Sequence, residues 1–314
     1  MNLWSLDFTT HDIEALDAAG FGAARAAGRF CWLDLAAEDF EALPEPLSTI
    51  VPASVAAELR AGPLSELRFD DAWIAFGLSE PVSEEGPVRG ANLLFSDGLL
   101  ITCDFRDSET LRRLRHTWRE DFLRFARSPG FLLFELGDHY ISVAQNHLHA
   151  LEDRIENLQR HLFGNADDSV FGDTAEAMRA LFDFRRRVVG AQEAFEELSA
   201  RSSSFIPEST QPFLARCALR LERMANELLL QRDGLVSGLN LYIGMNGHRT
   251  GLLLQRLTGF SIIFLPLSFF AGVFGMNFTH FPGIDARYGF EGFWIVCALI
   301  TLTLLAVARR GRWF

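Results

Sequence analysis

The sequence contains no lysine, and its cysteines are few and scattered. We attribute the missing lysine to genomic composition. The four cysteines include no CxxC pair, give no zinc-finger or redox signal and suit a reducing compartment; they are Cys31, Cys103, Cys217 and Cys297. A phosphate-binding loop motif is also missing, so we expect no direct use of ATP. Since no Ser, His and Asp order indicates hydrolysis either, the sequence predicts a protein that is not an enzyme.

Charge is absent from two long runs near the C-terminus. Leu257–Phe274 has 18 residues and Gly292–Ala308 has 17, all uncharged. At about 1.5 Å per residue, each run approaches the roughly 30 Å core of a bilayer once flanking residues are added. Only the 17 residues of Gly275–Glu291 separate the two runs. The sequence therefore predicts a helical hairpin in a membrane, with everything upstream held on one side.

Arginine placement predicts how this hairpin is oriented. Basic residues flank the two spans at the ends away from the short loop: His248, Arg249, Arg256, Arg309, Arg310 and Arg312. The loop has one arginine, Arg287, against Asp285 and Glu291. The positive-inside rule then places both termini in the cytoplasm. The first residues are acidic and unlike a signal peptide, so we expect a multi-pass protein of a bacterial-type inner membrane.

The formal charge of −12 is unevenly distributed. Residues 1–247 carry 39 acids and 23 arginines, whereas residues 248–314 carry two acids and six arginines. An acidic upstream part argues against a nucleic-acid partner. It is compatible with cation attraction or simply with a soluble surface. The run Arg185–Arg187 lies within a predicted helix among acids, so we expect a solvated or salt-bridged face there.

The first part of the chain has the pattern of an α/β domain. We expect strands at Phe30–Leu35, Asp71–Leu78, Asn92–Phe95 and Leu99–Cys103, the last two joined by a turn at Ser96–Gly98. Short helices are expected at Val55–Ala61 and Ser108–Phe125, and a loop at Ser79–Arg89.

Long helices follow. One carries a coiled-coil-like seam of Leu148, Leu151, Ile155, Leu158 and Leu162, and ends at Gly164–Asp168. The next is expected at about Thr174–Ala200, followed by a turn at Ser202–Ser204. The glycines after it bracket no loop, so we predict one very long helix from about Gln211 to Phe274. Four histidines (His139, His147, His149 and His161) spread around one helix, and we expect no zinc site from them.

One face of the first apolar span is made mostly of small or hydroxylated residues. We call this face the stripe; its members follow steps of three and four: Gly251, Leu254, Thr258, Ser261, Leu265, Ser268, Gly272 and Gly275. Such a stripe indicates either close helix packing or a pore lining shared by several identical helices. One hairpin cannot enclose a path, so transport would demand an oligomer. Neither span has a carboxylate, so a passing ion would meet water, hydroxyls and carbonyls, which is plausible for Mg²⁺.

The stripe ends at Gly275-Met276-Asn277. Glycine permits a positive φ at the helix exit, and asparagine offers an amide at the mouth. Phe274–Phe278, at the end of such a span and shortly before Phe281-Pro282, resembles the signature of the CorA family of divalent cation transporters. The similarity extends along the chain, over Asn246–Thr258, Phe264–Phe269, Leu132–Phe163, Met178–Leu198 and Arg310–Phe314.

The resemblance implies a homopentamer with an α+β cytoplasmic funnel domain, long helices and two C-terminal transmembrane helices per chain. It implies that Asn277 selects a hydrated divalent ion, which is the substrate and a regulator, with no permanently bound cofactor. Thr258 and Ser268 would line the pore, and Leu254 and Leu265 would act as dewetting constrictions. The segments expected are residues 1–128 (cytoplasmic α/β domain), 129–250 (long helices and stalk), 251–275 (pore helix), 276–291 (external loop), 292–309 (second transmembrane helix) and 310–314 (basic cytoplasmic tail).

The sequence departs from the family's magnesium pattern at three places. Phe274 stands where tyrosine is common, Gly283 follows Pro282 where an acid is usual, and Gly251 often corresponds to asparagine. The Pro282-Gly283 loop is closer to the zinc-transporting ZntB branch. His280 would suit a softer ion, although a lone loop histidine is more often simply solvated. Mg²⁺, Co²⁺ and Zn²⁺ therefore all stay open as substrates.

Two further points stay open. Asp71 and Asp104 are the candidates for a regulatory cation site in the upstream domain. Gly251 and the missing loop carboxylate also motivate a second hypothesis, a CorA-like membrane scaffold or sensor that transports little or no metal. Gly244-Met245-Asn246 repeats the three-residue motif before the span, and we interpret this repeat as a coincidence.

Overall fold

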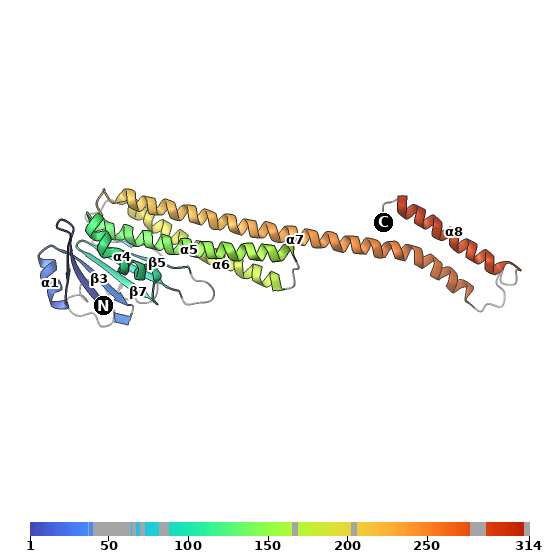
Figure 1. Cartoon of the computed structure of the whole chain (residues 1–314), viewed down its shortest axis with the longest axis horizontal. Helices are drawn as coiled ribbons and strands as arrows, with labels where there is room; N and C mark the ends of the chain where they lie inside the picture. Colours follow the sequence, from blue (N-terminus) through green and yellow to red (C-terminus); the bar gives the residue numbers. More distant parts are fainter. Residues whose placement is uncertain are drawn as a thin grey trace. The chain divides into compact units, whose positions relative to one another are not determined.

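The structure is a computed structural model that divides into two units, Met1–Ser237 and Gly238–Phe314 (Figure 1). The residues it describes are 1–36, 38–39, 64, 67–69, 73–81, 88–164, 169–201, 206–276 and 287–310, without the side chain of Ala308. Helix α7 (Gln211–Phe274) is continuous across the boundary between the units, as the sequence predicts. The six segments expected from the sequence stay predictions.

A seven-stranded sheet forms the base of the first unit, in the order β2-β1-β3-β7-β6-β5-β4. Its strands are β1 (Asn2–Asp7), β2 (Asp12–Ala15), β3 (Phe30–Ala36), β4 (Arg68–Phe69), β5 (Trp73–Ser79), β6 (Gly90–Ser96) and β7 (Leu99–Phe105). All pairs are antiparallel except the central pair β3 and β7. The carboxyl ends of β3 and β7 therefore meet at one edge.

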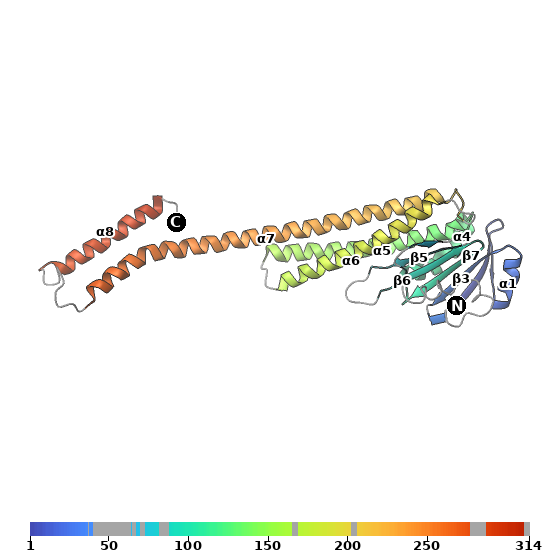
Figure 2. The ribbon, with the colours of Figure 1, turned by 180° about the vertical axis from the view of Figure 1, so that it is seen from behind.

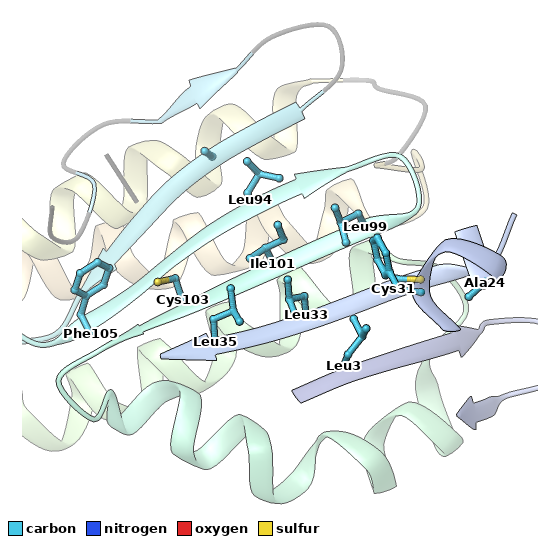
Figure 3. Close-up of a cluster of buried hydrophobic side chains, with 12 residues drawn as sticks. Leu3, Ala24, Cys31, Leu33, Leu35, Leu94, Leu99, Ile101, Cys103 and Phe105 are labelled. Carbon is cyan, nitrogen blue, oxygen red and sulfur yellow. The ribbon is translucent and has the colours of Figure 1, made fainter. Parts of the chain in front are cut away.

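The central strands are buried on both faces, which explains their continuous apolar runs. On one face, Leu3, Leu33, Ile101 and Leu94 stand in register across four neighbouring strands, and Figure 3 shows this row. Helix α1 (Ala18–Ala26) adds Phe21 and Ala24 to the same buried cluster.

The opposite face is covered by helix α4 (Glu109–Phe125) through aromatic side chains. The ring of Trp32 lies 4.9 Å from that of Trp4 and 4.9 Å from that of Trp118, measured between centroids. Such tilted aromatic contacts add to the stabilisation from buried area. The helix thus docks on the sheet through its apolar side, and its polar side faces away.

An ion cluster interrupts this apolar packing at the carboxyl edge of β3 and β7. Arg115 of α4 reaches both strands: its Nε donates to Asp34 at 2.8 Å and its Nη1 to Asp104 at 2.7 Å. Thr102 donates to Asp34 at 2.8 Å and accepts from Trp32 Nε1 at 3.2 Å. Since Asp34 is 2% exposed, these bonds compensate a carboxylate that has lost its water.

Glu80, just after β5, caps the N-terminus of α4. Its carboxylate accepts from the Ser108 hydroxyl at 2.7 Å and from the backbone N–H groups of Glu109 and Thr110 at 3.1 and 2.7 Å. Free N–H groups and the helix dipole both favour an anion there. The carbonyl of Glu80 accepts from Arg187 at 3.1 Å. This short segment thereby links the sheet to two helices.

Three long helices, α5 (Gly130–Phe163), α6 (Ser169–Ala200) and the first part of α7, pack together in the first unit (Figures 1 and 2). Helix α6 runs antiparallel to α5, and α7 runs parallel to α5. Asp138 pairs with Arg220, and Glu152 accepts from Gln231 at 3.0 Å. At Gly137 a Cβ would lie 2.6 Å from the ring of Phe195, so glycine is required for this close approach.

The structure confirms the hairpin of β6 and β7, with Gly98 at φ +73° in its turn, and helix α4 with Ser108 as its N-cap. The predicted seam is buried except for the half-buried Leu151. Helix α6 begins five residues earlier than expected, at Ser169. The predicted helix Val55–Ala61, the turn Ser202–Ser204 and the candidate Asp71 lie outside the described residues.

We expect Asp34→Ala to lower the free energy of unfolding by about 3 kcal/mol, because it leaves the Arg115 guanidinium and the Thr102 hydroxyl without their shared partner. Asp183→Ala is the control. It breaks an exposed 3.2 Å pair with Arg186 and should cost under about 0.5 kcal/mol. Urea unfolding of the full-length protein, followed by tryptophan fluorescence, measures both. Equal unfolding midpoints for the two variants would contradict the importance of this cluster.

Candidate pore helix and its mouth

The second unit contains the end of α7 and helix α8 (Gly289–Arg310). Both α7 and the segment Gly289–Val307 are long and apolar enough to cross a membrane. The two apolar runs expected from the sequence therefore lie on helices of suitable length.

The whole stripe of α7 is exposed in the protomer. Every one of its eight members, from Gly251 to Gly275, is exposed, with Leu254 at 58% and Leu265 at 74%. A Cβ built at Gly251 or Gly272 would meet nothing within 4 Å. Packing inside this protomer therefore does not explain why these positions are small.

The opposite side of α7 is the covered one. Gly259 is buried, and the half-buried residues of the span are Ile262, Ile263, Pro266, Leu267, Phe270 and Val273. On α8, Cys297 is buried, and the ring of Phe293 lies 5.0 Å from that of Phe274. Helix α8 thus lies against the apolar side of α7, which is partly covered, and leaves the stripe free.

Two hydroxyls of the stripe, those of Thr258 and Ser261, donate to their own helix. Thr258 Oγ1 donates to the Leu254 carbonyl at 2.8 Å, and Ser261 Oγ donates to the Leu257 carbonyl at 2.9 Å. Each hydroxyl oxygen keeps its acceptor lone pairs, so the stripe can accept hydrogen bonds from water. Such oxygens suit the hydration shell of a cation.

Pro266 interrupts the hydrogen-bond ladder of the span. Proline has no N–H, so the Ile262 carbonyl loses its ordinary partner four residues later. Figure 1 shows α7 curving in its last segment, which is the usual consequence of a proline inside a helix. Both residues lie on the covered side, away from the stripe.

The helix ends in a tight turn. The Gly275 N–H donates to the Ala271 carbonyl at 2.9 Å, and the Met276 N–H donates to the Val273 carbonyl at 3.3 Å. Gly275 is not among the residues with positive φ, so the conformational freedom that glycine permits at a helix exit is not used here. A Cβ there would lie 3.1 Å from the Ala271 oxygen, so a larger residue would meet a tight contact. Asn277 and His280 lie outside the described residues.

The other candidates from the sequence are engaged in contacts within the first unit. Asp104 accepts from Arg115 and, through its other oxygen, from the Ser108 N–H at 2.8 Å. Over the described ranges, no group of three His, Cys, Asp or Glu residues could hold a metal ion. Within the run Arg185–Arg187, Arg186 pairs with Asp183 as predicted, whereas Arg187 is half-buried and donates to the Glu80 carbonyl. Burial raises the pKa of the Cys217 thiol to about 12, which makes it unreactive.

A family model described as "CorA-like Mg2+ transporter protein" matches residues 27–310. The chain belongs to this family. CorA-family proteins are membrane transporters rather than enzymes, which is consistent with the two candidate spans and with the expectation from the sequence.

Individual relatives are more distant. The cobalt/magnesium transport protein CorA of Thermotoga maritima is 24% identical over 64% of this chain and 57% of its own length. The divalent cation transporter CmaX of Pseudomonas aeruginosa is 30% identical over 52% of this chain and 46% of its own length. The zinc transport protein ZntB of Pectobacterium carotovorum is 22% identical over 56% of each chain. The matched segments thus span about half of these relatives.

Solved structures agree in fold over the whole chain. The CorA magnesium transporter of Methanocaldococcus jannaschii superposes with a TM-score of 0.81 at 18% identity, covering 100% of this chain and 98% of the other. Full-length CmaX gives a TM-score of 0.73 at 16% identity over the same shares.

Sequence reasoning missed the covered side of the span, centred on Gly259 and Pro266. The signal was present, because Gly259, Ile263, Pro266 and Phe270 also follow steps of three and four. The apolar residues on that side did not stand out as a separate face, because nearly the whole span is apolar.

We expect Ser261→Cys and Ser268→Cys to react with a charged, water-soluble thiol reagent about tenfold or more faster than Phe260→Cys. The thiolate that reacts forms only where water is present. Phe260 is 57% exposed in the protomer but lies off the stripe, where lipid would cover it. Labelling is measured in reconstituted protein with the four native cysteines replaced. Equal rates at all three positions would favour the stripe as a helix-packing seam.

Proposed function

We propose that the protein transports divalent metal cations across a membrane through a pore that several copies of the chain enclose together. The family resemblance implies five copies of the chain. The observation that carries the proposal is the exposed stripe of α7, on the side of the helix that α8 leaves free. Such a surface, small and partly hydroxylated within an apolar span, needs other copies to shield it from lipid.

The chemistry of the stripe supports passage of a hydrated ion. It carries no charge, and Thr258 and Ser261 offer oxygen acceptors. Mg²⁺ dehydrates reluctantly and is suited by such neutral contacts. Rings of Leu254 and Leu265 from each copy would form apolar constrictions that close by dewetting.

The mouth of the pore is proposed at Gly275-Met276-Asn277, with Asn277 as the residue that selects the ion. His280 is a further candidate ligand for a softer ion. We propose the divalent cation as substrate and as regulator, without a permanently bound cofactor. We also propose an inner-membrane location with the first unit and both termini in the cytoplasm, on the basis of the arginines around the spans.

Asn277→Ala should abolish uptake of divalent cations into proteoliposomes, because the mouth loses the amide proposed to hold the hydrated ion. Asn246→Ala is the matched control, since it alters the same three-letter motif at an exposed site of α7 before the span. We expect this control to keep most of the uptake. Equal loss of uptake in both variants, or a larger loss in Asn246→Ala, would contradict the assignment of Asn277 to the mouth.

Competitive uptake of Mg²⁺, Co²⁺, Ni²⁺ and Zn²⁺ by the purified protein distinguishes the candidate substrates. Transport of Mg²⁺ alone would contradict a zinc transporter, and dependence on a pH gradient would favour one. We expect uptake of at least one of these ions well above that of empty liposomes. Its complete absence would instead support the scaffold or sensor hypothesis that Gly251 and the missing loop acid motivate.

A further inference from the structure

Helices α4 and α5 meet along a row of polar side chains in the first unit. The helices run antiparallel, so successive turns of α4 face successive turns of α5 in reverse order. Arg113 Nη1 donates to Ser142 Oγ at 3.1 Å. One turn further, Thr117 Oγ1 and His139 Nε2 lie 3.0 Å apart. These polar contacts join the two helices at two successive turns.

The next level brings acids of both helices together. Asp121 follows Thr117 by one turn of α4, and Glu135 precedes His139 by one turn of α5. The Glu135 side chain is only 15% exposed, and its Oε2 lies 3.8 Å from His139 Nε2. Charged carboxyls that share a half-buried site repel each other, and a proton on one of them relieves the repulsion.

The nearby arginines have partners of their own. Arg113 of α4 is held by Glu109, with Nε at 3.0 Å from its carboxylate, as well as by Ser142. Arg220 of α7 pairs with Asp138, the residue between Glu135 and His139 on this side of α5. Neither arginine is an ion-pair partner of Glu135 in the described part of the chain.

The other helices packed against this stretch present cation–π and apolar contacts. Arg216 of α7 lies 5.5 Å from the ring centre of Phe134 and 5.5 Å from that of Phe213. From α6, the ring of Phe195 contacts the stretch at Gly137. The charged groups that act on Glu135 are therefore its neighbours in the α4–α5 seam.

Burial moves both titratable groups toward their neutral forms. Burial is the largest cause, and together with the charges of Asp121 and Asp138 it raises the pKa of Glu135 to about 7. Burial lowers the pKa of His139, with Asp138 and Asp121 opposing that effect and Arg113 adding to it. The Glu135–His139 pair therefore holds one proton just below neutral pH and loses it above.

We propose that Asp121, Glu135 and His139 form a proton-sensitive latch between α4 and α5, closed while the Glu135–His139 pair holds one proton and loosened when that proton is lost. After the loss, Glu135 carries a negative charge beside Asp121, and the repulsion acts across the seam. Asp138, next in line, ties α5 to α7 through Arg220. Loosening α4 thus acts on the helix to which α7 is attached.

The sign of the pH dependence follows from the two shifts. The folded pKa of Glu135 lies above its ordinary value, so its contribution to stability is complete in acid and disappears as the pH rises through about 7. The folded pKa of His139 lies below its ordinary value, so its contribution is lost as the pH falls through that lowered pKa. The latch is therefore tightest slightly below neutral pH.

Hydrogen exchange of the full-length protein, measured by mass spectrometry from pH 6.5 to 8.5 and corrected for intrinsic rates, tests the latch. We expect protection of α4 and of the first half of α5 to fall by about three- to tenfold over this range. Glu135→Gln resembles the protonated form and should keep its protection throughout. Glu120→Gln, at an exposed site of α4, should follow the wild-type profile.

Asp121→Asn separates a titrating latch from a merely structural contact. Removing this charge lowers the pKa of Glu135, so the loss of protection should move to lower pH. A flat wild-type profile, an unchanged pH dependence in Glu135→Gln, or an unmoved midpoint in Asp121→Asn would each overturn the proposal. Because every readout lies in the first unit, failure of the proposed transport would leave this result unaffected.

Discussion

The backbone of one helix, α7, must satisfy its own hydrogen bonds over 64 residues, and the rest of the structure depends on this constraint. Up to Leu235 the helix buries a seven-residue repeat against its neighbours: Leu214, Leu221, Leu228 and Leu235 are each at most 1% exposed. Beyond Leu235 this repeat ends, and from Leu257 the helix continues as an apolar span. A helix is one of the few structures that can enter a bilayer without leaving polar backbone groups unpaired. The same backbone hydrogen-bond ladder therefore satisfies α7 both where it packs against other helices and where it is an apolar span.

Within the span, one side of α7 is more covered than the other in the protomer. The side with Gly259 and Phe270 is partly covered, whereas the stripe is exposed. In a membrane the hydrophobic effect does not hold helices together, so small residues and hydroxyls normally mark where helices approach each other. The exposed stripe is such a surface without a partner in the protomer. Association of several copies and a shared polar path would both follow from this one asymmetry.

Local chemistry was predictable from the sequence, whereas contacts between distant segments were not. The β6–β7 hairpin follows from Ser96-Asp97-Gly98, and the extent of α7 follows from the lack of a stop signal between Gln211 and Phe274. Strands β1 and β2 and helix α1 were missed because each is short and lacks strong periodicity. The Arg115–Asp34 contact joins residues 81 positions apart, and nothing in the spacing indicates it.

The turn at the end of the stripe shows a similar limit. Glycine at a helix end permits a left-handed conformation, yet Gly275 does not adopt one, and its N–H still donates to the carbonyl four residues earlier. What disfavours a larger residue there is the approach of the Ala271 oxygen, a contact that composition alone does not reveal. The role of Asn277 stays a prediction, and so does that of the stripe, although its exposure supports it.

The chemistry of the stripe also limits where selectivity can arise. Zn²⁺ prefers nitrogen and sulfur ligands, and the stripe offers only neutral oxygen and apolar groups. A row of hydroxyls and leucines would pass any small hydrated divalent ion with little preference. We infer that discrimination among such ions depends on the few residues at the end of the span and in the loop, Asn277 and His280 among them.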